Sequence, residues 1–401
     1  MRNGLVAVAS CLVWACTPAP QTIAGPSGSK LDVPSGALKS PAQLAITTVT
    51  SGYPALTPLS GSTVFALTPH GQTFAVPVTV TLPAAPGETR LLTAQPGGEW
   101  SAVPGAHRVG DTIVAEVTHF SFFVPATAPA VRAIVGDGWA VREIDPADGG
   151  VRTLVDGVPE RAYITSVAVD DQGRVYWLDN VTDALARVDA NGGGKQVLYT
   201  ASDPYLNPTG LAVDGAHGAL FWAQGHDVMR AQLDGSGAAP FVSGANGEYP
   251  TSVAVAGGFV FWTDEGTETV NRIGTDGSGR VVLHTTADPF ANPRALSVDL
   301  TAGAVFWGEG FGLLGLALDG GATSAVFAGS FEGTWVTGTA VDPDARQIYW
   351  TDNGADSLSR ASYDGSGRET LYQSPFWSPV SLDAGSGAGN TTNPHGVALT
   401  R

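Results

Sequence analysis

Cysteine is almost absent from this chain: its 401 residues include two, Cys11 and Cys16, and both lie near the start. The rest of the chain therefore has no internal disulfide, and its stability must come from packing. Basic residues are also few, with 20 Lys and Arg against 37 Asp and Glu, which gives a formal net charge of −17. A surface of that sign repels phosphate backbones, so the composition argues against a nucleic-acid partner.

Long hydrophobic runs are missing as well. The run from Leu5 to Trp14 follows the basic Arg2 and is too short for a mature membrane span, which is the pattern of a secretory signal. The sequence Val13-Trp14-Ala15-Cys16 resembles a bacterial lipobox, and this resemblance implies acylation of Cys16 after cleavage. Cys11 is a second candidate, and an ordinary secretory signal is the alternative to both. We expect a lipoprotein signal peptide at 1–16, a flexible linker at 17–29, and an exported protein anchored in the cell envelope.

Glycine and proline, in contrast, are abundant. An internal repeat runs through the second half of the chain. Each of the first five copies opens with a short apolar segment, continues with an aromatic-Trp pair and an Asp-Gly turn, and ends with a β-rich run, and a sixth opening segment follows. The six opening segments are Ile164 to Asp170, Pro208 to Asp214, Pro250 to Ala256, Pro293 to Asp299, Val336 to Asp342 and Pro394 to Thr400.

Four short strands separated by turns make one blade of a β-propeller. The segment from Val131 to Val155 contains three such strands but no opening segment, and the last copy, Pro394 to Thr400, has no strands after it. We therefore expect these two pieces to build one blade together. The fold class that follows is all-β, with a six-bladed propeller at 126–401 closed by the C-terminal strand.

The repeats resemble the YWTD repeats of the low-density-lipoprotein-receptor family. Phe261-Trp262-Thr263-Asp264 and Tyr349-Trp350-Thr351-Asp352 match the signature closely, and Trp177-Leu178-Asp179 keeps its Trp and Asp. Trp222-Ala223-Gln224 and Trp307-Gly308-Glu309 depart from it. The resemblance implies a propeller that binds other macromolecules and whose motif residues have a structural role.

Residues 30–125 have a different pattern. Thr73 to Leu82 alternates strictly between apolar and polar residues, and shorter alternating runs precede and follow it, which predicts an antiparallel β-sandwich. The motifs "LDVPSGAL" and "THFSFFV" resemble the ZU domain of ankyrins and netrin receptors. In some relatives of that domain a His-Phe-Ser sequence cleaves itself before the serine, so the resemblance makes His119, Phe120 and Ser121 a candidate autoproteolysis site.

Two functions remain open: a binding protein, or a propeller enzyme of the lactonase or lyase type. The opening segments are apolar and small, and we find no metal-ligand spacing or catalytic motif, so we favour a monomeric binding protein with no metal and no cofactor. Its partner is a protein or a glycan, bound by loops on one face. These loops carry Asp203, Tyr205, Glu248, Tyr249, Asp288, Phe290, Phe331, Glu332 and Trp377 before the opening segments, and Asp179, Asp264, Glu309 and Asp352 after the Trp strands.

Overall fold

The computed structural model describes residues 19–40, 42–54, 62–103, 105–127, 131–156, 163–203, 206–245, 247–286, 288, 291–328, 334–374 and 394–400. Strands make up nearly all of the regular structure, which confirms the all-β fold class. Within the described ranges no helix is both long and apolar enough to cross a membrane. The chain divides into two compact units, Met1–Ala128 and Pro129–Arg401. The expected signal peptide and Cys16 lie outside the described residues.

The first unit is an antiparallel β-sandwich with a shared core that includes Leu31, Phe65, Val80 and Phe123. Along Thr112–His119, buried residues alternate with more exposed ones, as expected when one face of a sheet covers the core. One sheet has the order β1 (Gln21–Ala24), β2 (Lys30–Val33), β5 (Thr73–Pro83), β9 (Thr112–His119), β8 (His107–Val109), and the other β3 (Ala45–Val49), β4 (Val64–Thr68), β10 (Phe122–Thr127), β6 (Glu88–Ala94), β7 (Ser101–Ala102).

From Gln21 onward, the expected linker at 17–29 is instead part of the first unit. Strand β1 pairs with β2 through a short 3-10 turn, η1 (Pro26–Gly28), and Thr22 donates a hydrogen bond of 2.6 Å from Oγ1 to Asp32. Proline and glycine build a turn here and do not mark a tether. In β5, Val76 is 41% exposed although it belongs to the alternating apolar run, because the pairing with β9 shifts register between Thr73 and Val78.

The second unit contains six four-stranded antiparallel sheets in the part of the chain that the structure describes, and we number them as blades. Blade 1 is β14 (Ile164–Val169), β15 (Val175–Asp179), β16 (Ala184–Val188), β17 (Gln196–Thr200), and blade 2 is β18 (Thr209–Asp214), β19 (Ala219–Gln224), β20 (Asp227–Gln232), β21 (Ala239–Val242). Blade 3 is β22 (Pro250–Ala256), β23 (Phe259–Asp264), β24 (Thr269–Gly274), β25 (Val281–Thr285), and blade 4 is β26 (Arg294–Asp299), β27 (Ala304–Glu309), β28 (Gly312–Ala317), β29 (Ser324–Phe327). Blade 5 is β30 (Val336–Asp342), β31 (Gln347–Asp352), β32 (Ser357–Ser362), β33 (Glu369–Gln373), and blade 6 is β34 (Pro394–Thr400), β11 (Arg132–Asp137), β12 (Ala140–Ile144), β13 (Val151–Asp156).

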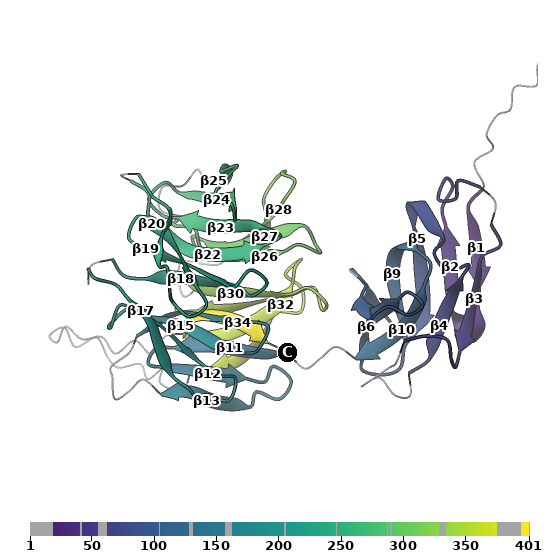
Figure 1. Ribbon diagram of the computed structural model, residues 1–401, viewed down its shortest axis with the longest axis horizontal. Coiled ribbons are helices and arrows are strands. Elements are labelled where there is room, and N and C mark those ends of the chain that lie inside the picture. The colour runs from purple at the N-terminus through teal and green to yellow at the C-terminus, as the bar shows by residue number, and fades with distance from the viewer. Residues whose placement is uncertain are drawn as a thin grey trace, which may run out of the picture. The chain divides into compact units, whose positions relative to one another are not determined.

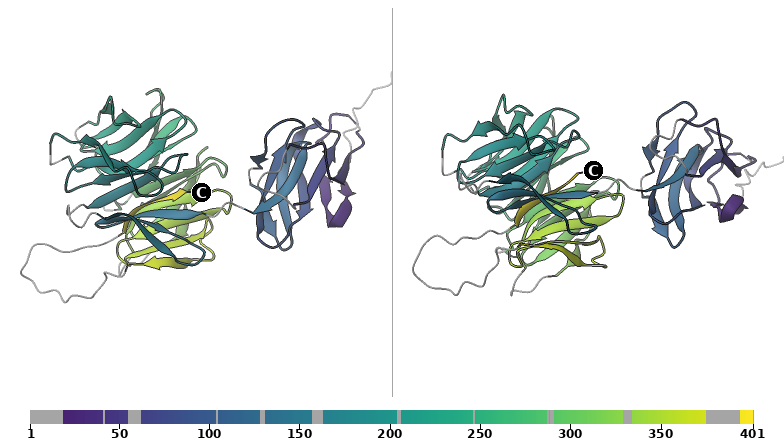
Figure 2. Two further views of the ribbon diagram at one scale, coloured as in Figure 1. Left: turned by 60° about the horizontal axis from the view of Figure 1, so that its bottom comes forward. Right: turned by 90° about the horizontal axis from the view of Figure 1, so that it is seen from below.

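Blade 6 joins the two ends of this unit. Strand β34 pairs antiparallel with β11, with Val397 opposite Val135 and Thr400 opposite Arg132. Figure 1 shows β34, in yellow, between β11 and β30, and the views in Figure 2 show the same yellow strand beside blue-teal ones. Around the centre, the inner strands β14, β18, β22, β26 and β30 each contact the next, and β34 contacts both β30 and β14. The inner strands therefore form a ring.

The tryptophan of each aromatic-Trp pair is a packing residue. Trp177, Trp222, Trp262, Trp307 and Trp350 are all at most 2% exposed. They lie in apolar clusters between sheets, and an arginine stacks on some of them, as Arg368 does 5.1 Å from the ring centre of Trp350. A large flat ring fills the space that opens between twisted blades.

The blades alternate in kind. In blades 1, 3 and 5 the loop after the second strand is long and ends in Asp183, Glu268 or Asp356, each with positive φ. In blades 2, 4 and 6 a tight turn replaces it, and a glycine with positive φ follows Gln224, Glu309 or Asp137. These loops therefore repeat every second blade, and we call two successive blades the two-blade unit.

The acidic or amide residues of blades 2, 4 and 6 have their own partners. Each contacts a ring on the outer strand of the preceding blade: Gln224 donates to the Tyr199 hydroxyl at 3.2 Å, Glu309 lies 3.3 Å from His284, and Asp137 accepts from the Tyr372 hydroxyl at 3.1 Å. These contacts tie neighbouring blades together. The departures from the YWTD signature in blades 2 and 4 thus belong to a second, regular pattern.

Candidate functional site

A cavity of about 360 Å³ opens in the centre of the ring, where the inner strands begin. We call it the channel mouth. Its wall contains residues at equivalent positions of blades 1, 3 and 5: the aromatic residues Tyr163, Tyr249 and Trp335, and the threonines Thr165, Thr251 and Thr337. Within each set the members are 86 residues apart, which is the length of the two-blade unit.

Small residues allow the inner strands to meet below the channel mouth. A Cβ atom on Gly396 would lie 2.9 Å from the Cα atom of Ser166, and Gly396 has a φ of +71°. At Gly338 a Cβ atom would overlap the backbone of Gly396 itself. Glycine at these two positions is thus required by the close approach of backbones at the centre.

Buried aspartates of the YWTD signature hold the aromatic residues in place. The backbone N–H groups of Tyr163, Tyr249 and Trp335 donate to Asp179, Asp264 and Asp352, with N···O distances of 2.9, 3.0 and 2.8 Å. Each carboxylate also accepts from the turn after the second strand, such as the N–H of Thr267 at 2.9 Å. Because the bonds use backbone groups, the side chains of Tyr249 and Trp335 stay 38% exposed.

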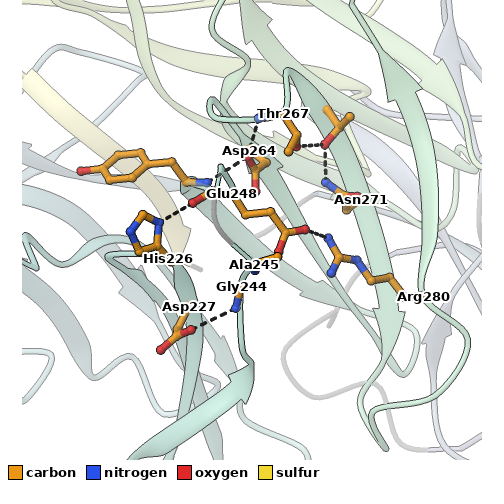
Figure 3. A network of polar contacts seen from close by, with 11 residues as sticks. His226, Asp227, Gly244, Ala245, Glu248, Asp264, Thr267, Asn271 and Arg280 are labelled. Atoms are coloured by element: carbon orange, nitrogen blue, oxygen red, sulfur yellow. Dashed lines mark hydrogen bonds and ion pairs between the residues drawn. The ribbon is translucent and has the colours of Figure 1, made fainter.

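The loop before β22 is fixed from the neighbouring blade as well (Figure 3). His226 lies 2.6 Å from the Glu248 carbonyl oxygen, and Gly244 donates to Asp227 at 3.0 Å. The Glu248 carboxylate accepts from Ala245 N–H at 2.7 Å and forms an ion pair with Arg280. The backbone just before and at Tyr249 is therefore held by blade 2 through His226 and by blade 3 through Asp264, and this places Tyr249 at the channel mouth.

Arg294 brings a buried positive charge to the channel mouth. The residue is 7% exposed, and its guanidinium carbon lies 3.5 Å from the ring centre of Trp335. Its Nε donates to the Asn292 carbonyl at 2.9 Å and lies 3.9 Å from the Glu265 carboxylate. Burial lowers the pKa of Arg294 to about 10, so the side chain remains charged at neutral pH.

Two carboxylates of blade 3, Glu265 and Glu268, lie near this arginine. Burial raises the pKa of Glu265, and the nearby Arg294 opposes that effect. Burial also raises the pKa of Glu268, whose carboxylate accepts from Asn292 N–H at 3.0 Å. In the described part of the chain, no group of three or more His, Cys, Asp and Glu side chains is placed to hold a metal ion.

The predicted face residues separate into three groups. Asp179, Asp264 and Asp352 are buried, and the partly buried Glu309 accepts from the Trp307 indole at 2.8 Å, so these four carboxylates have partners inside the propeller. Asp203 and Asp288 are exposed, Glu248 is ion-paired, and Tyr249 lies at the channel mouth. Tyr205, Phe290, Phe331, Glu332 and Trp377 lie outside the described residues.

The sequence reasoning missed Tyr163, Trp335, Arg294 and Glu265. The inner strands were expected to offer small, apolar side chains to the channel, whereas the channel mouth is also lined by an aromatic residue just before β14, β22 and β30 and by a threonine at the second position of each of these strands. The 86-residue spacing of Tyr163, Tyr249 and Trp335 was a signal that could have found them.

The candidate autoproteolysis site lies in the sandwich, between β9 and β10, where the chain passes from one sheet to the other. Phe120 and Ser121 are fully buried, and the Ser121 hydroxyl donates to the Ala94 carbonyl. The Phe120 carbonyl accepts from Gly71 N–H at 3.1 Å. Cleavage before Ser121 requires the hydroxyl to leave Ala94 and attack the Phe120 carbonyl carbon. Self-cleavage stays a prediction, and the mass of the purified chain tests it.

Comparison with known proteins supports the fold. No known family model matches the chain. It is 28% identical over 217 residues to a low-density lipoprotein receptor-related protein 1 of Pyricularia oryzae, covering 45% of this chain and 70% of that protein. It is 32% identical over 127 residues to protein cueball of Drosophila willistoni, covering 30% of this chain and only 19% of that relative. These matches support a propeller of the YWTD, low-density-lipoprotein-receptor class B type.

Among solved structures, a chain from a crystal structure of a nidogen/laminin complex matches with a TM-score of 0.56. The match covers 68% of this chain and 98% of that one at 16% identity, so it bears on fold alone. A streptogramin B lyase structure matches with a TM-score of 0.48 at 14% identity, covering 80% of this chain and 91% of that one. At that level the likeness carries no conclusion about chemistry.

Proposed function

We propose that this chain is a binding protein whose propeller uses the channel mouth and the loops around it to bind a protein or a glycan. The observation that carries the proposal is the recurrence of Tyr163, Tyr249 and Trp335 around one opening that also contains Arg294. Tyr, Trp and Arg are the residue types that dominate binding hot spots. Exposed rings on a backbone held by buried carboxylates form a surface that is ordered before a ligand arrives.

A binding role suits this propeller better than the alternative role, that of a lactonase-type or lyase-type enzyme. Such an enzyme would need a base or metal ligands facing the channel. The described side chains of the channel mouth include aromatic rings, threonine hydroxyls and the Arg294–Glu265 pair, and these suit recognition.

The proposal also includes the place of the protein in the cell. Residues 1–16 support export, and acylation of Cys16 would anchor a monomeric chain at the cell envelope or surface. Mass analysis of the mature N-terminus tests this part. A mature chain that begins elsewhere and carries no lipid would contradict it.

Replacing Tyr249 and Trp335 together with alanine should abolish capture of the ligand from extracts of the cell envelope or on a glycan array. Truncating an aromatic anchor typically costs about 2 kcal/mol or more of binding free energy, so the double variant should lose at least about a thousandfold in affinity if the two effects add. The fold should survive, because the hydrogen bonds to Asp264 and Asp352 come from the backbone.

Phe259→Ala is the matched control. Phe259 is a partly buried aromatic residue at the opposite end of the hairpin that carries Tyr249, since it pairs with Ala256 while Pro250 pairs with Asp264. This variant should keep the ligand. If the wild type and the double variant capture the same molecules, the channel mouth is not the binding site.

A further inference from the structure

The donors of Arg294 are only partly used. A guanidinium carries five N–H donors. Nε donates to Asn292, and Nη2 makes a long contact of 3.4 Å with the Ala291 carbonyl. Nη1 is buried and has no hydrogen-bond partner, while the Glu265 carboxylate lies 3.9 Å from Nε, beyond hydrogen-bonding distance. An unused donor on a buried cation costs free energy, and a ligand acceptor placed at the channel mouth would relieve that cost.

The charges around Arg294 favour one kind of anion as its ligand. Glu265 and Glu268 lie close to Arg294, and the whole chain carries a net charge of −17. A doubly charged phosphate group would be repelled by this field, whereas a carboxylate brings one charge and a planar pair of oxygens. A planar pair of oxygens fits the planar donors of arginine. The acceptor that best suits Nη1 is a carboxylate.

The other side chains that line the channel mouth indicate which kind of molecule carries the carboxylate. Trp335 and Tyr249 offer half-exposed flat rings. Thr165 and Thr251 donate their hydroxyl protons to the carbonyls of Pro208 and Pro293, at 3.0 and 3.1 Å, and Thr251 then accepts from the Thr263 hydroxyl at 3.1 Å. A hydroxyl oxygen has two lone pairs, so both threonines keep capacity to accept from a ligand donor. A sugar ring has an apolar face for the aromatic rings and hydroxyl donors for the threonines. An Asp or Glu side chain of a protein has neither.

We infer that the channel mouth binds a hexuronic acid at the end of a glycan. Its carboxylate accepts from Nη1 of Arg294, its ring packs against Tyr249, and its hydroxyls donate to Thr165 and Thr251. A cavity of about 360 Å³ is within the range of small-ligand pockets, which suits one sugar residue with the rest of the glycan outside. This inference rests on the proposed function and names the ligand class for that site.

The test is calorimetric titration of the full chain with cellobiouronate and with cellobiose, which differ in one carboxylate. Cellobiouronate should bind at least about tenfold more tightly, because one hydrogen bond to a charged group is worth about that factor. Arg294→Gln should lose the preference. Arg368→Gln should keep it, since Arg368 also stacks on a tryptophan, Trp350, but does not line the channel mouth.

Thermal melting of each variant separates loss of binding from loss of fold. If Arg294→Gln does not fold, Tyr249→Ala replaces it, and this variant should weaken cellobiouronate binding by about tenfold or more. Equal binding of the two sugars, binding of neither, or an unchanged preference in Arg294→Gln would overturn the inference. So would a poly-glutamate peptide that binds in place of the sugar in an Arg294-dependent way. If envelope extracts still yield a ligand that the Tyr249 and Trp335 double variant loses, the proposed function stands without the acidic sugar.

Discussion

A chain that ends at residue 393 should be insoluble, or should melt more than about 10 °C below the full chain. The deletion removes β34, which pairs with β11 and contacts both β14 and β30. It exposes the apolar neighbours of Val397, among them Val135 and Leu358, and leaves the edge of β11 unpaired. Calorimetry of the soluble fraction measures the effect. A truncated chain that melts within two or so degrees of the full chain would mean that another contact closes the ring.

Point variants of β34 separate ring closure from the mere shortening of the chain. Val397→Asp puts a charge into an apolar cluster and should destabilise the unit strongly, because a buried charge without a partner is costly. Thr400→Asp lies on the same strand, opposite Arg132, and should melt close to the wild type. Similar melting temperatures for the two variants would contradict a packing role for β34.

Asp264→Ala should both destabilise the propeller and weaken binding. Asp264 is fully buried and accepts from the N–H groups of Tyr249 and Thr267. Each buried donor left without a partner costs about 1–3 kcal/mol, so the variant should lose roughly 2–6 kcal/mol of unfolding free energy. The loop before β22 also loses one of the contacts that hold it, so affinity at the channel mouth should fall even where the variant remains folded.

The control for this variant is Asp276→Ala in the same blade. Asp276 accepts from the N–H and the hydroxyl of Ser278 within an exposed turn, at 2.9 and 2.8 Å. Its loss should change neither melting nor binding appreciably. If Asp264→Ala resembles Asp276→Ala in both measurements, the signature aspartate does not hold the loop.

Much of the propeller could be predicted because the repeat fixes strand order and turn positions. The Trp and Asp of the signature recur at a constant place, and in blades 1, 3 and 5 the structure gives them the internal roles that such recurrence indicates: Trp177 packs, and Asp179 accepts from backbone N–H groups. The linker prediction was wrong because composition alone does not distinguish a tether from a tight turn, and β1 needs its partner β2 to be recognised as a strand.

The channel mouth was harder to predict. Arg294 occupies in blade 4 the position of Thr165 in blade 1. A comparison of the repeats alone therefore shows one polar residue in place of another and does not single out the arginine. Its importance depends on its burial, on the ring of Trp335 beneath it, and on the distance to Glu265, and none of these follows from spacing. Tyr163 and Trp335 were not predicted, because comparing successive blades hides a pattern that repeats every second blade.

The most direct test of the channel mouth as the binding site is hydrogen–deuterium exchange of the full chain with and without the ligand captured from envelope extracts. Binding should slow exchange in the segments that begin β14, β22, β26 and β30, which meet at the channel mouth. The outer strands β17, β21, β25 and β29 serve as the internal reference and should exchange as before. Protection confined to the outer strands or to the first unit, with the channel mouth unchanged, would contradict the account.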